Sequence, residues 1–342
     1  KIKEKVNLNN INFNFVVDEK FFLINAIAAN FKNIKITEGK INVNRKNQLF
    51  IKGSFKSHIN IYSISNIKNL IPYSIPSNIN NIKLKGEFLN KFDLKLSDSL
   101  EILDYNYLLD GSILNSKLNL KNFFKSNIFN HSFDKMFTKK SVLKINLNKK
   151  KKNSLTLGGL YSFDNINFKN FVLKNNLKKN NNEYYVDFDF KKKFSVDVLN
   201  FTSAPKKVSN VKSKFNFSKN KIFIKEFIFK EGKNKIDIKN LRIKNNKLEK
   251  FDNINILTFT NDVKNNNFKI SLKDKIYIKG HTYDSTLLVK LLKSNTKSNF
   301  LNNINKKIEI KFENVMTRSF LPLKKFNLLG IIEKGQFIKI NS

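Results

Sequence analysis

The chain has 342 residues, 40% of them hydrophobic, so it is long enough for two or three ordinary domains and can bury a large apolar surface. Its 65 Lys and Arg residues against 27 Asp and Glu give a formal charge of +38, which taken alone favours an anionic partner. The absence of Cys excludes disulfides and thiolate metal sites, and no apolar run reaches the ~18 residues that predict a membrane-spanning helix.

Alternation of apolar and polar residues at period two recurs from one end of the chain to the other and predicts strands. In chain order the clearest runs are Ile11, Phe13 and Phe15; Ile41 and Val43; Leu143, Ile145 and Leu147; Val186, Phe188 and Phe190; Phe215 and Phe217; Ile236 and Ile238; Leu241 and Ile243; Ile254 and Ile256; and Ile308, Ile310 and Phe312. Polar segments at 38–40, 148–153, 179–183 and 230–235 are predicted to be turns. About 25 strands at a spacing of roughly 8 to 12 residues indicate a mainly β protein.

Helix is expected only in short pieces. After the strand pattern of Ile276 and Ile278, Asp284 or Ser285 can cap a helix over 284–294. The leucines at 287, 288, 291 and 292 would share one face of this helix, which would cover a sheet edge or, alternatively, gate a groove. Parts of 64–71, 121–138 and 296–304 are further helix candidates.

Gly53, Gly86, Gly111 and Gly280 each follow an aliphatic residue by two positions. Glycine inside a strand pattern is typical of a bulge or a bend. Bends at intervals would give a long sheet its curvature.

Residues for catalysis or metal binding are scarce. His58, His131 and His281 stand far apart, and no phosphate-binding glycine motif occurs. Asp187 and Asp189 share one strand face and could bind a cation or share a proton, but they are more simply the solvent-facing half of the strand. We therefore predict a protein that is not an enzyme and that has no cofactor and no metal site.

The positive charge alone does not predict nucleic-acid binding. Only Arg45, Arg242 and Arg318 are arginine, and the fork geometry that grips phosphates and base edges belongs to Arg. Lys, Asn, Ile and Phe also have A/T-rich codons, so a biased genome would produce much of this composition. The lysines at 149–152 most simply form a solvated hairpin tip, although a polybasic loop can also contact anionic headgroups.

So many sequential strands must fold back, close or curl, because an open sheet rarely exceeds about ten strands. Either two sheets cover each other as a sandwich, or one long curled sheet leaves an apolar inner face that acyl chains could fill. The pattern favours a single elongated β region over 1–342, with a possible sub-boundary near 121–140.

The carboxy-terminal third, from "IYIKGHTYDSTLLVKLLKS" at 276–294 to residue 340, resembles the AsmA-like superfamily, especially YhdP-like proteins. In those sequences a strand ends in Gly, an Asp opens a short Leu-rich helix, and further strands follow. The matching positions here are Gly280, Asp284, 287–292, and then Ile308, Ile310, Phe312 and Val315. The segment 70–88 is similar to the family's Pro-containing helix before a Gly-bearing strand.

This resemblance implies a long antiparallel, taco-like β-groove, anchored at the inner membrane of a Gram-negative bacterium and projecting into the periplasm. It implies transport of phospholipid between the inner and outer membranes, with acyl chains in the groove and groove-capping proteins as further candidate partners. The chain begins at Lys1 and lacks the family's amino-terminal anchor, so we expect it to be a fragment of a longer protein.

Ten residues are candidates for the groove lining, because alternate residues of neighbouring strands would share one face. They are Phe188, Phe190, Phe215, Phe217, Ile236, Ile238, Ile254, Ile256, Ile276 and Ile278. Two other functions stay open at this point. One is an outer-membrane-type β-barrel, which the lack of Trp disfavours, and the other is a lysine-rich nucleic-acid-binding β protein.

Overall fold

A computed structural model describes residues 8–19, 21–45, 48–63, 79–120, 134–150, 152–177, 182–191, 193–204, 207–218, 220–287, 304–318, 321–334 and 336–341. Of these residues 80% lie in β-strands, which confirms the prediction of a mainly β protein. The one helical element among them is the short 3-10 helix η2 (Asp197–Leu199). The chain divides into two compact units, residues 1–125 with 131–178 and residues 126–130 with 179–342.

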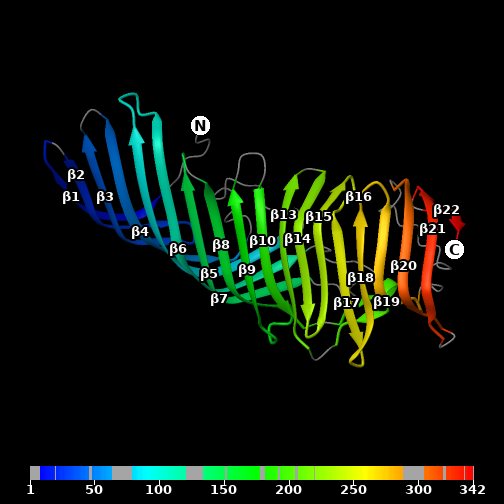
Figure 1. Ribbon diagram of the computed structural model, residues 1–342. Coiled ribbons are helices and arrows are strands. Elements are labelled where there is room, and N and C mark those ends of the chain that lie inside the picture. The colour runs from blue at the N-terminus through cyan, green and yellow to red at the C-terminus, as the bar shows by residue number, and fades with distance from the viewer. Residues whose placement is uncertain are drawn as a thin grey trace. The chain divides into compact units, whose positions relative to one another are not determined.

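Unit 1 is a meander in which each strand pairs antiparallel with the next one along the chain (Figure 1). Its strands are β1 (Asn9–Val17), β2 (Phe21–Phe31), β3 (Ile34–Arg45), β4 (Leu49–Ile61), β5 (Ile79–Leu96), β6 (Ile102–Leu120), β7 (Lys135–Asn148), β8 (Asn153–Ser162) and β9 (Lys169–Leu177). Short loops link most neighbouring strands, so local pairing accounts for this topology.

The main strands of unit 2 pair in the order β10–β13–β14–β15–β17–β18–β19–β20–β21–β22. These strands are β10 (Asn182–Phe190), β13 (Ser209–Ser218), β14 (Lys221–Glu231), β15 (Asn234–Lys244), β17 (Asn253–Thr260), β18 (Val263–Leu272), β19 (Ile276–Asp284), β20 (Lys306–Met316), β21 (Leu323–Glu333) and β22 (Gln336–Asn341). The short β16 (Lys247–Lys250) pairs with the end of β15. A separate two-stranded piece, β11 (Ser195–Val196) and β12 (Phe201–Thr202), flanks η2.

The sheet of unit 2 is mixed, which corrects the expectation of a purely antiparallel sheet. β19 and β20 run parallel, with Ile278 opposite Ile310. Parallel neighbours need a crossover connection rather than a tight hairpin, and residues 285–305 supply it here. All other neighbouring strands in this sheet are antiparallel.

A left-handed residue keeps β15 amphipathic where strict alternation would fail. Ile236 and Ile238 differ in parity from Leu241 and Ile243, so a regular strand would turn the two pairs to opposite faces. Asn240 between them has φ 54°, a conformation that Asn tolerates better than most residues. Leu241 consequently packs on the apolar face against the buried cluster that contains Leu248 and Phe251, and the two predicted strands at 236–238 and 241–243 form one.

At two of the glycines predicted at bulges, the neighbouring strand lies too close to leave room for a side chain. A Cβ at Gly280 would be 2.3 Å from the Cβ of Phe268, at a point where the β18–β19 register shifts. A Cβ at Gly111 would be 2.6 Å from the Cα of Phe88. The glycines predicted at bulges therefore also serve packing, because any larger residue would displace a buried Phe.

Several predicted turns and helices differ from the structure. The segment 38–40 is not a turn, because Glu38, with φ 53°, and Gly39 form an irregularity inside β3. Residues 135–138 of the expected helix at 121–138 belong to β7, and 121–133 lie outside the described residues. The predicted turns at 148–153 and 230–235 do connect antiparallel strands.

Most of the helix expected at 284–294 lies outside the described residues. The same holds for the other helix candidates, at 64–71 and 296–303. Asp284 is the last residue of β19, and its Oδ1 accepts hydrogen bonds from Thr286 N and Oγ1 at 3.1 and 2.6 Å. Residues 285–287 are not helical, and 288–294 are not described. The residues near 121–140, where the sequence suggests a sub-boundary, are described only from 134 onward.

Candidate functional site

One face of the unit 2 sheet carries all ten candidate lining residues. Directly opposed residues in a ladder point to the same face, and the pairs Ile236–Ile256 and Ile238–Ile254 join β15 to β17 in this way. On β10, Phe188 opposes Val211, and Tyr184, four residues earlier on the same face, opposes Phe215. We call this surface the apolar face of unit 2.

The side chains of the ten residues differ in how much they are exposed on that face. Ile256 and Ile276 are buried, whereas Phe217 is 56% exposed. The other seven, Phe188, Phe190, Phe215, Ile236, Ile238, Ile254 and Ile278, are half-buried. Ile238 belongs to neither of the two buried apolar clusters described next.

A segment that we call the strap, residues 194–204 with β11, η2 and β12, lies across part of this apolar face. Phe194, Leu199 and Phe201 of the strap are buried against Phe229 and Ile256. The Phe194 and Phe229 rings meet edge to face with their centroids 5.1 Å apart. The strap is thus the second layer over these strands, where a sandwich would have a full second sheet.

Polar side chains hold the strap in register with the sheet. Asn266, fully buried on β18, donates from Nδ2 to the Leu199 carbonyl at 2.6 Å and to Thr258 Oγ1 at 2.8 Å. Asn200 Nδ2 donates to Asp284 Oδ2 at 2.8 Å. The Tyr283 hydroxyl donates to the Val198 carbonyl at 3.0 Å, and burial raises the pKa of this phenol to about 12.

A second apolar cluster lies further along the same strands. Leu248 on β16 and Phe251 in the bend after it pack against Leu272, Ile276 and Ile308. These three sheet residues are in register across β18, β19 and β20. The second cluster therefore covers a different row of side chains from the one under the strap.

Between the two clusters lies a row of aliphatic side chains that neither cluster buries. Its members are directly paired from strand to strand, and we call them the isoleucine row: Ile254, Ile270, Ile278 and Ile310. All four are half-buried, and each contacts both clusters. The sequence could not identify this row, because its position depends on cross-strand register.

Unit 1 also presents an apolar face, which the sequence analysis did not assign to a site. Directly paired residues are Leu109 on β6, Ile145 on β7 and Leu155 on β8. The next pair on the same face, two residues along each strand, is Leu143 with Leu157. These residues are half-buried. Every described strand of unit 1 belongs to the meander, so the described residues provide no strap or second sheet over this face.

A polar spot interrupts the apolar face of unit 1. The Tyr107 hydroxyl donates to Asn90 Oδ1 at 2.7 Å, and Asn90 Nδ2 donates to Ser57 Oγ at 2.9 Å. Burial raises the pKa of the Tyr107 phenol, so it stays neutral and remains a donor. Since these groups satisfy one another, the spot is compatible with an otherwise apolar surface.

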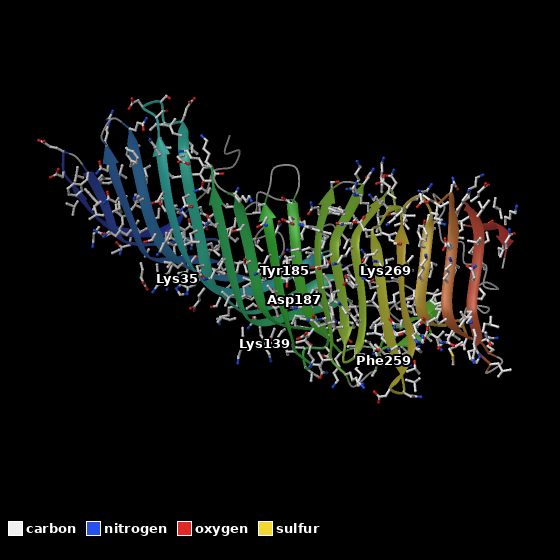
Figure 2. All side chains as sticks on the ribbon, viewed as in Figure 1. Lys35, Lys139, Tyr185, Asp187, Phe259 and Lys269 are labelled. Atoms are coloured by element: carbon white, nitrogen blue, oxygen red, sulfur yellow. The ribbon has the colours of Figure 1, made fainter. Side chains whose placement is uncertain are left out.

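Asp187, labelled in Figure 2, and Asp189 alternate with Phe188 and Phe190 along β10, so the acidic pair lies on the opposite, polar face. Asn210 Nδ2 donates to Asp187 Oδ1 at 2.9 Å and to Asp189 Oδ1 at 2.8 Å, and Lys212 Nζ lies 3.0 Å from Asp187 Oδ2. Burial opposes ionisation of Asp187, but hydrogen bonds from Asn210 and Lys212 outweigh it and lower its pKa. Asp187 is therefore a structural carboxylate that these hydrogen bonds favour in its ionised form.

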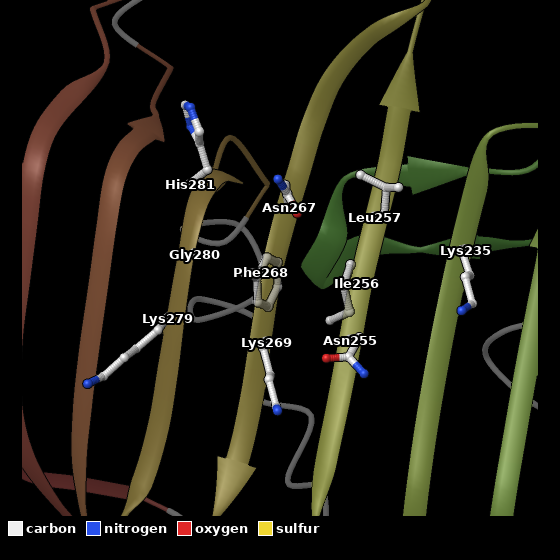
Figure 3. Close-up of a pocket in the computed structure, with 10 residues that line it drawn as sticks. All are labelled: Lys235, Asn255, Ile256, Leu257, Asn267, Phe268, Lys269, Lys279, Gly280 and His281. Atoms are coloured by element: carbon white, nitrogen blue, oxygen red, sulfur yellow. The ribbon is translucent and has the colours of Figure 1, made fainter.

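Lysines on the polar face of unit 2 surround a shallow depression, which lies over Gly280 (Figure 3). Two of them contact nearby carboxylates: Lys235 Nζ is 3.5 Å from Asp237 Oδ2, and Lys279 Nζ is 3.4 Å from Glu309 Oε1. His281 Nε2 is 3.3 Å from Glu313 Oε2. Much of this positive charge is thus compensated locally.

Other predicted polar candidates also make local contacts. His58 Nδ1 is 3.5 Å from Glu87 Oε1, and His131 lies outside the described residues. At the hairpin tip, Lys149 Nζ donates to the Ile102 carbonyl at 2.9 Å, and Lys150 Nζ is 3.1 Å from Asp104 Oδ2. In the described part of the chain, no three His, Asp or Glu residues are grouped so that they could hold a metal ion.

Glu309 provides a pH-dependent contribution to stability. Its carboxylate is 8% exposed and lies between Lys275, Lys311 and Lys279, whose hydrogen bonds lower its pKa from 4.5 to about 2. The ionised form therefore stabilises the fold above pH 4.5, and this contribution disappears as the pH falls towards 2. Chemical denaturation at pH 6 to 2 should show a steeper loss of unfolding free energy for the wild type than for Glu309→Gln.

The exposed Glu313 on the same strand provides the control. Glu313→Gln should lose unfolding free energy with pH as steeply as the wild type does. The Glu313 side chain is 70% exposed, and among the described residues it forms an ion pair only with His281. Equal slopes for Glu309→Gln and the wild type would show that the lysine cluster does not stabilise the folded state.

None of the helices formed by the described residues is long and apolar enough to span a bilayer. A scan of protein-family models and searches of curated proteins and of solved structures found no match to this chain.

Proposed function

We propose that this protein is a non-enzymatic lipid carrier that holds the acyl chains of phospholipids on the apolar faces of its sheets. The observation that carries the proposal is the apolar face of unit 1, where paired residues such as Leu109 and Ile145 stay half-buried under no described second layer. A water-soluble protein rarely leaves a large contiguous apolar surface unoccupied. Hydrocarbon chains suit such a face because they carry no polar groups that would need partners there.

The finer form of the proposal is a curled, groove-like sheet that conducts phospholipid between two membranes. The bulges and left-handed residues in β3, β7 and β15 support it, because such irregularities add local twist and bend. By analogy with the AsmA-like, YhdP-like proteins that the sequence resembles, we propose that this activity takes place in the periplasm of a Gram-negative bacterium, at the inner membrane. Capping proteins and an anchor belong to the same proposal.

Site-specific photo-crosslinking tests the proposal. A benzophenone amino acid at Leu109 or Ile238, both on apolar faces, should capture phospholipid in cells, and native mass spectrometry of the purified chain should detect co-purifying phospholipid. The same amino acid at Lys144 or Lys239 provides matched controls, because these exposed neighbours point to the polar faces. Absence of lipid adducts at both apolar positions, or equal labelling of both faces, would refute the proposal.

A further inference from the structure

A depression in the polar face of unit 1 lies on the side of the sheet opposite to Leu109 and Ile145. Its volume is about 290 Å³, and residues of β2 to β6 and of the turn between β2 and β3 line it. Lys35, labelled in Figure 2, is directly opposed to His58, and His58 is directly opposed to Glu87. Directly opposed side chains point to the same face, so these three line the depression together.

A β-bulge lies at this depression. The register of β5 with β6 shifts between Lys85 and Gly86, because Leu114 is an extra residue on β6 between their partners Asn115 and Ile113. A bulge interrupts the ladder and bends the strand, so the surface is not flat at this point. Leu114 is 42% exposed and lines the depression.

The lysines of the depression have no carboxylate partners. Lys32, Lys35 and Lys85 are exposed, and none of them forms an ion pair or a hydrogen bond with another described residue. Among the described residues that line the depression, Glu87 is the one carboxylate, and its Oε1 lies 3.5 Å from His58 Nδ1. Three lysines against one carboxylate leave an excess of two positive charges, even with a neutral His58.

From this charge and shape we infer that the depression is a binding site for a phosphomonoester group, carried by a small soluble molecule or by a lipid headgroup. Lysine binds phosphate as a point charge and needs no guanidinium fork for it. The half-buried Asn30, directly opposed to Lys35, adds an uncharged donor, because its side-chain amide has no partner among the described residues. The inference does not depend on the lipid-carrier function, since these side chains lie on the polar face.

Charge and size favour a monoester over a diester. A phosphomonoester carries about −1.5 to −2 charges at pH 7 and has three free oxygens, which matches the excess of two positive charges. Each phosphate of a nucleic-acid backbone is a diester with one charge. The volume of about 290 Å³ corresponds to roughly ten water molecules, which is enough for a phosphate and a few attached atoms.

The depression over Gly280 in unit 2 provides a comparison within the same chain (Figure 3). It has the same volume, lies at a register shift between β18 and β19, and also contains a His–Glu pair. Its Lys235 and Lys279, however, lie 3.5 and 3.4 Å from carboxylate oxygens, so only Lys269 of its three lysines is without a partner among the described residues. We therefore expect phosphomonoesters to prefer the depression of unit 1.

Labelling with pyridoxal phosphate tests the site in the wild-type chain. The aldehyde condenses with a lysine amine and loses water, borohydride reduces the imine to a stable amine, and the labelled peptides are mapped by mass spectrometry. At limiting reagent, Lys32, Lys35 or Lys85 should be labelled at least about fivefold more than Lys235, Lys269 and Lys279. Excess glycerol 3-phosphate should suppress this labelling, whereas acetate at equal ionic strength should not. Pyridoxal, which lacks the phosphate, should show no preference between the two depressions.

Two variants test the lysines one at a time. Lys35→Gln and Lys85→Gln should each weaken binding of glycerol 3-phosphate, measured by calorimetry, at least about fivefold. Both lysines are exposed and unpaired, so the melting temperature should not change. Lys91→Gln is the matched control, because it removes the same charge from an exposed position on the same face of β5, outside the depression. It should bind as the wild type does.

Vesicle flotation separates the two sources of the phosphate. Flotation with phosphatidylcholine vesicles that contain phosphatidic acid, lost in Lys35→Gln, would identify a lipid headgroup as an accepted ligand. Binding of glycerol 3-phosphate without flotation would restrict the site to soluble phosphomonoesters. Equal protection by acetate, equal labelling of the two depressions, stronger protection by a DNA oligonucleotide without terminal phosphate, or unchanged binding in both variants would each overturn the inference.

Discussion

Phe229→Asp is expected to unfold unit 2, whereas Ile238→Asp should leave the sheet folded and abolish lipid binding to its apolar face. Phe229 is 3% exposed and its ring contacts Phe194 and Phe201 of the strap. Replacing a buried Phe by a small side chain costs about 3–5 kcal/mol, and burying an unpaired carboxylate adds several more. The sum equals most of the 5–15 kcal/mol by which domains are typically stable.

Ile238 differs from Phe229 in what covers it. It is half-buried and belongs to neither buried cluster, so a carboxylate there can stay hydrated. The backbone ladder to Phe227 and Ile254 does not depend on its side chain. We therefore expect a stability loss below about 2 kcal/mol, together with at least a tenfold fall in lipid occupancy, because a charge among acyl chains is strongly unfavourable.

Circular dichroism melts and native mass spectrometry distinguish the two variants. Asn327→Asp is the matched control, since it changes the charge by the same amount at an exposed position on the polar face. Unfolding by Ile238→Asp would indicate that the position is sealed inside a protein core. Normal lipid occupancy in a folded Ile238→Asp variant would remove the apolar face of unit 2 from the proposed lipid path.

The sequence predicted strands well because one local property, period-two alternation, determines them. Ile308, Ile310 and Phe312 lie in β20 as expected, as do Leu143, Ile145 and Leu147 in β7. Alternation misled only where the backbone breaks it. Asn240 joins two predicted strands into β15, and Glu38 with Gly39 gives an irregularity inside β3 where the composition suggested a turn.

The arrangement around the site depends on contacts that the sequence pattern does not encode. The strap has no sustained alternation, and its main polar anchor joins Leu199 to Asn266, 67 residues away. The isoleucine row requires the register of four strands, including the parallel pairing of Ile278 with Ile310. Periodicity could therefore assign ten lining candidates to one face. It could not predict which of them the strap buries.

Asn266→Leu should detach the strap from the sheet, with a large loss of stability. Leu has nearly the shape of Asn but makes no hydrogen bond, so the Leu199 carbonyl, Thr258 Oγ1 and the Asp284 N–H each lose the Asn266 side chain as a partner. Each unsatisfied buried group costs about 1–3 kcal/mol, so we expect a loss of at least about 3 kcal/mol. For a unit of this size that corresponds to a melting temperature lower by roughly 6–12 °C.

Hydrogen exchange locates the effect within unit 2. In Asn266→Leu the amides of the strap should exchange much faster, while those in the middle of β14 and β15 keep their protection, because the sheet ladder is independent of the strap. Thr258→Val, which removes one hydroxyl and keeps the shape, should produce a smaller change in the same direction. Asn327→Leu, at an exposed position, should change neither stability nor exchange. Unaltered exchange in the strap of Asn266→Leu would mean that Phe194, Leu199 and Phe201 hold the strap by apolar packing alone, and that the buried amide sets only its register.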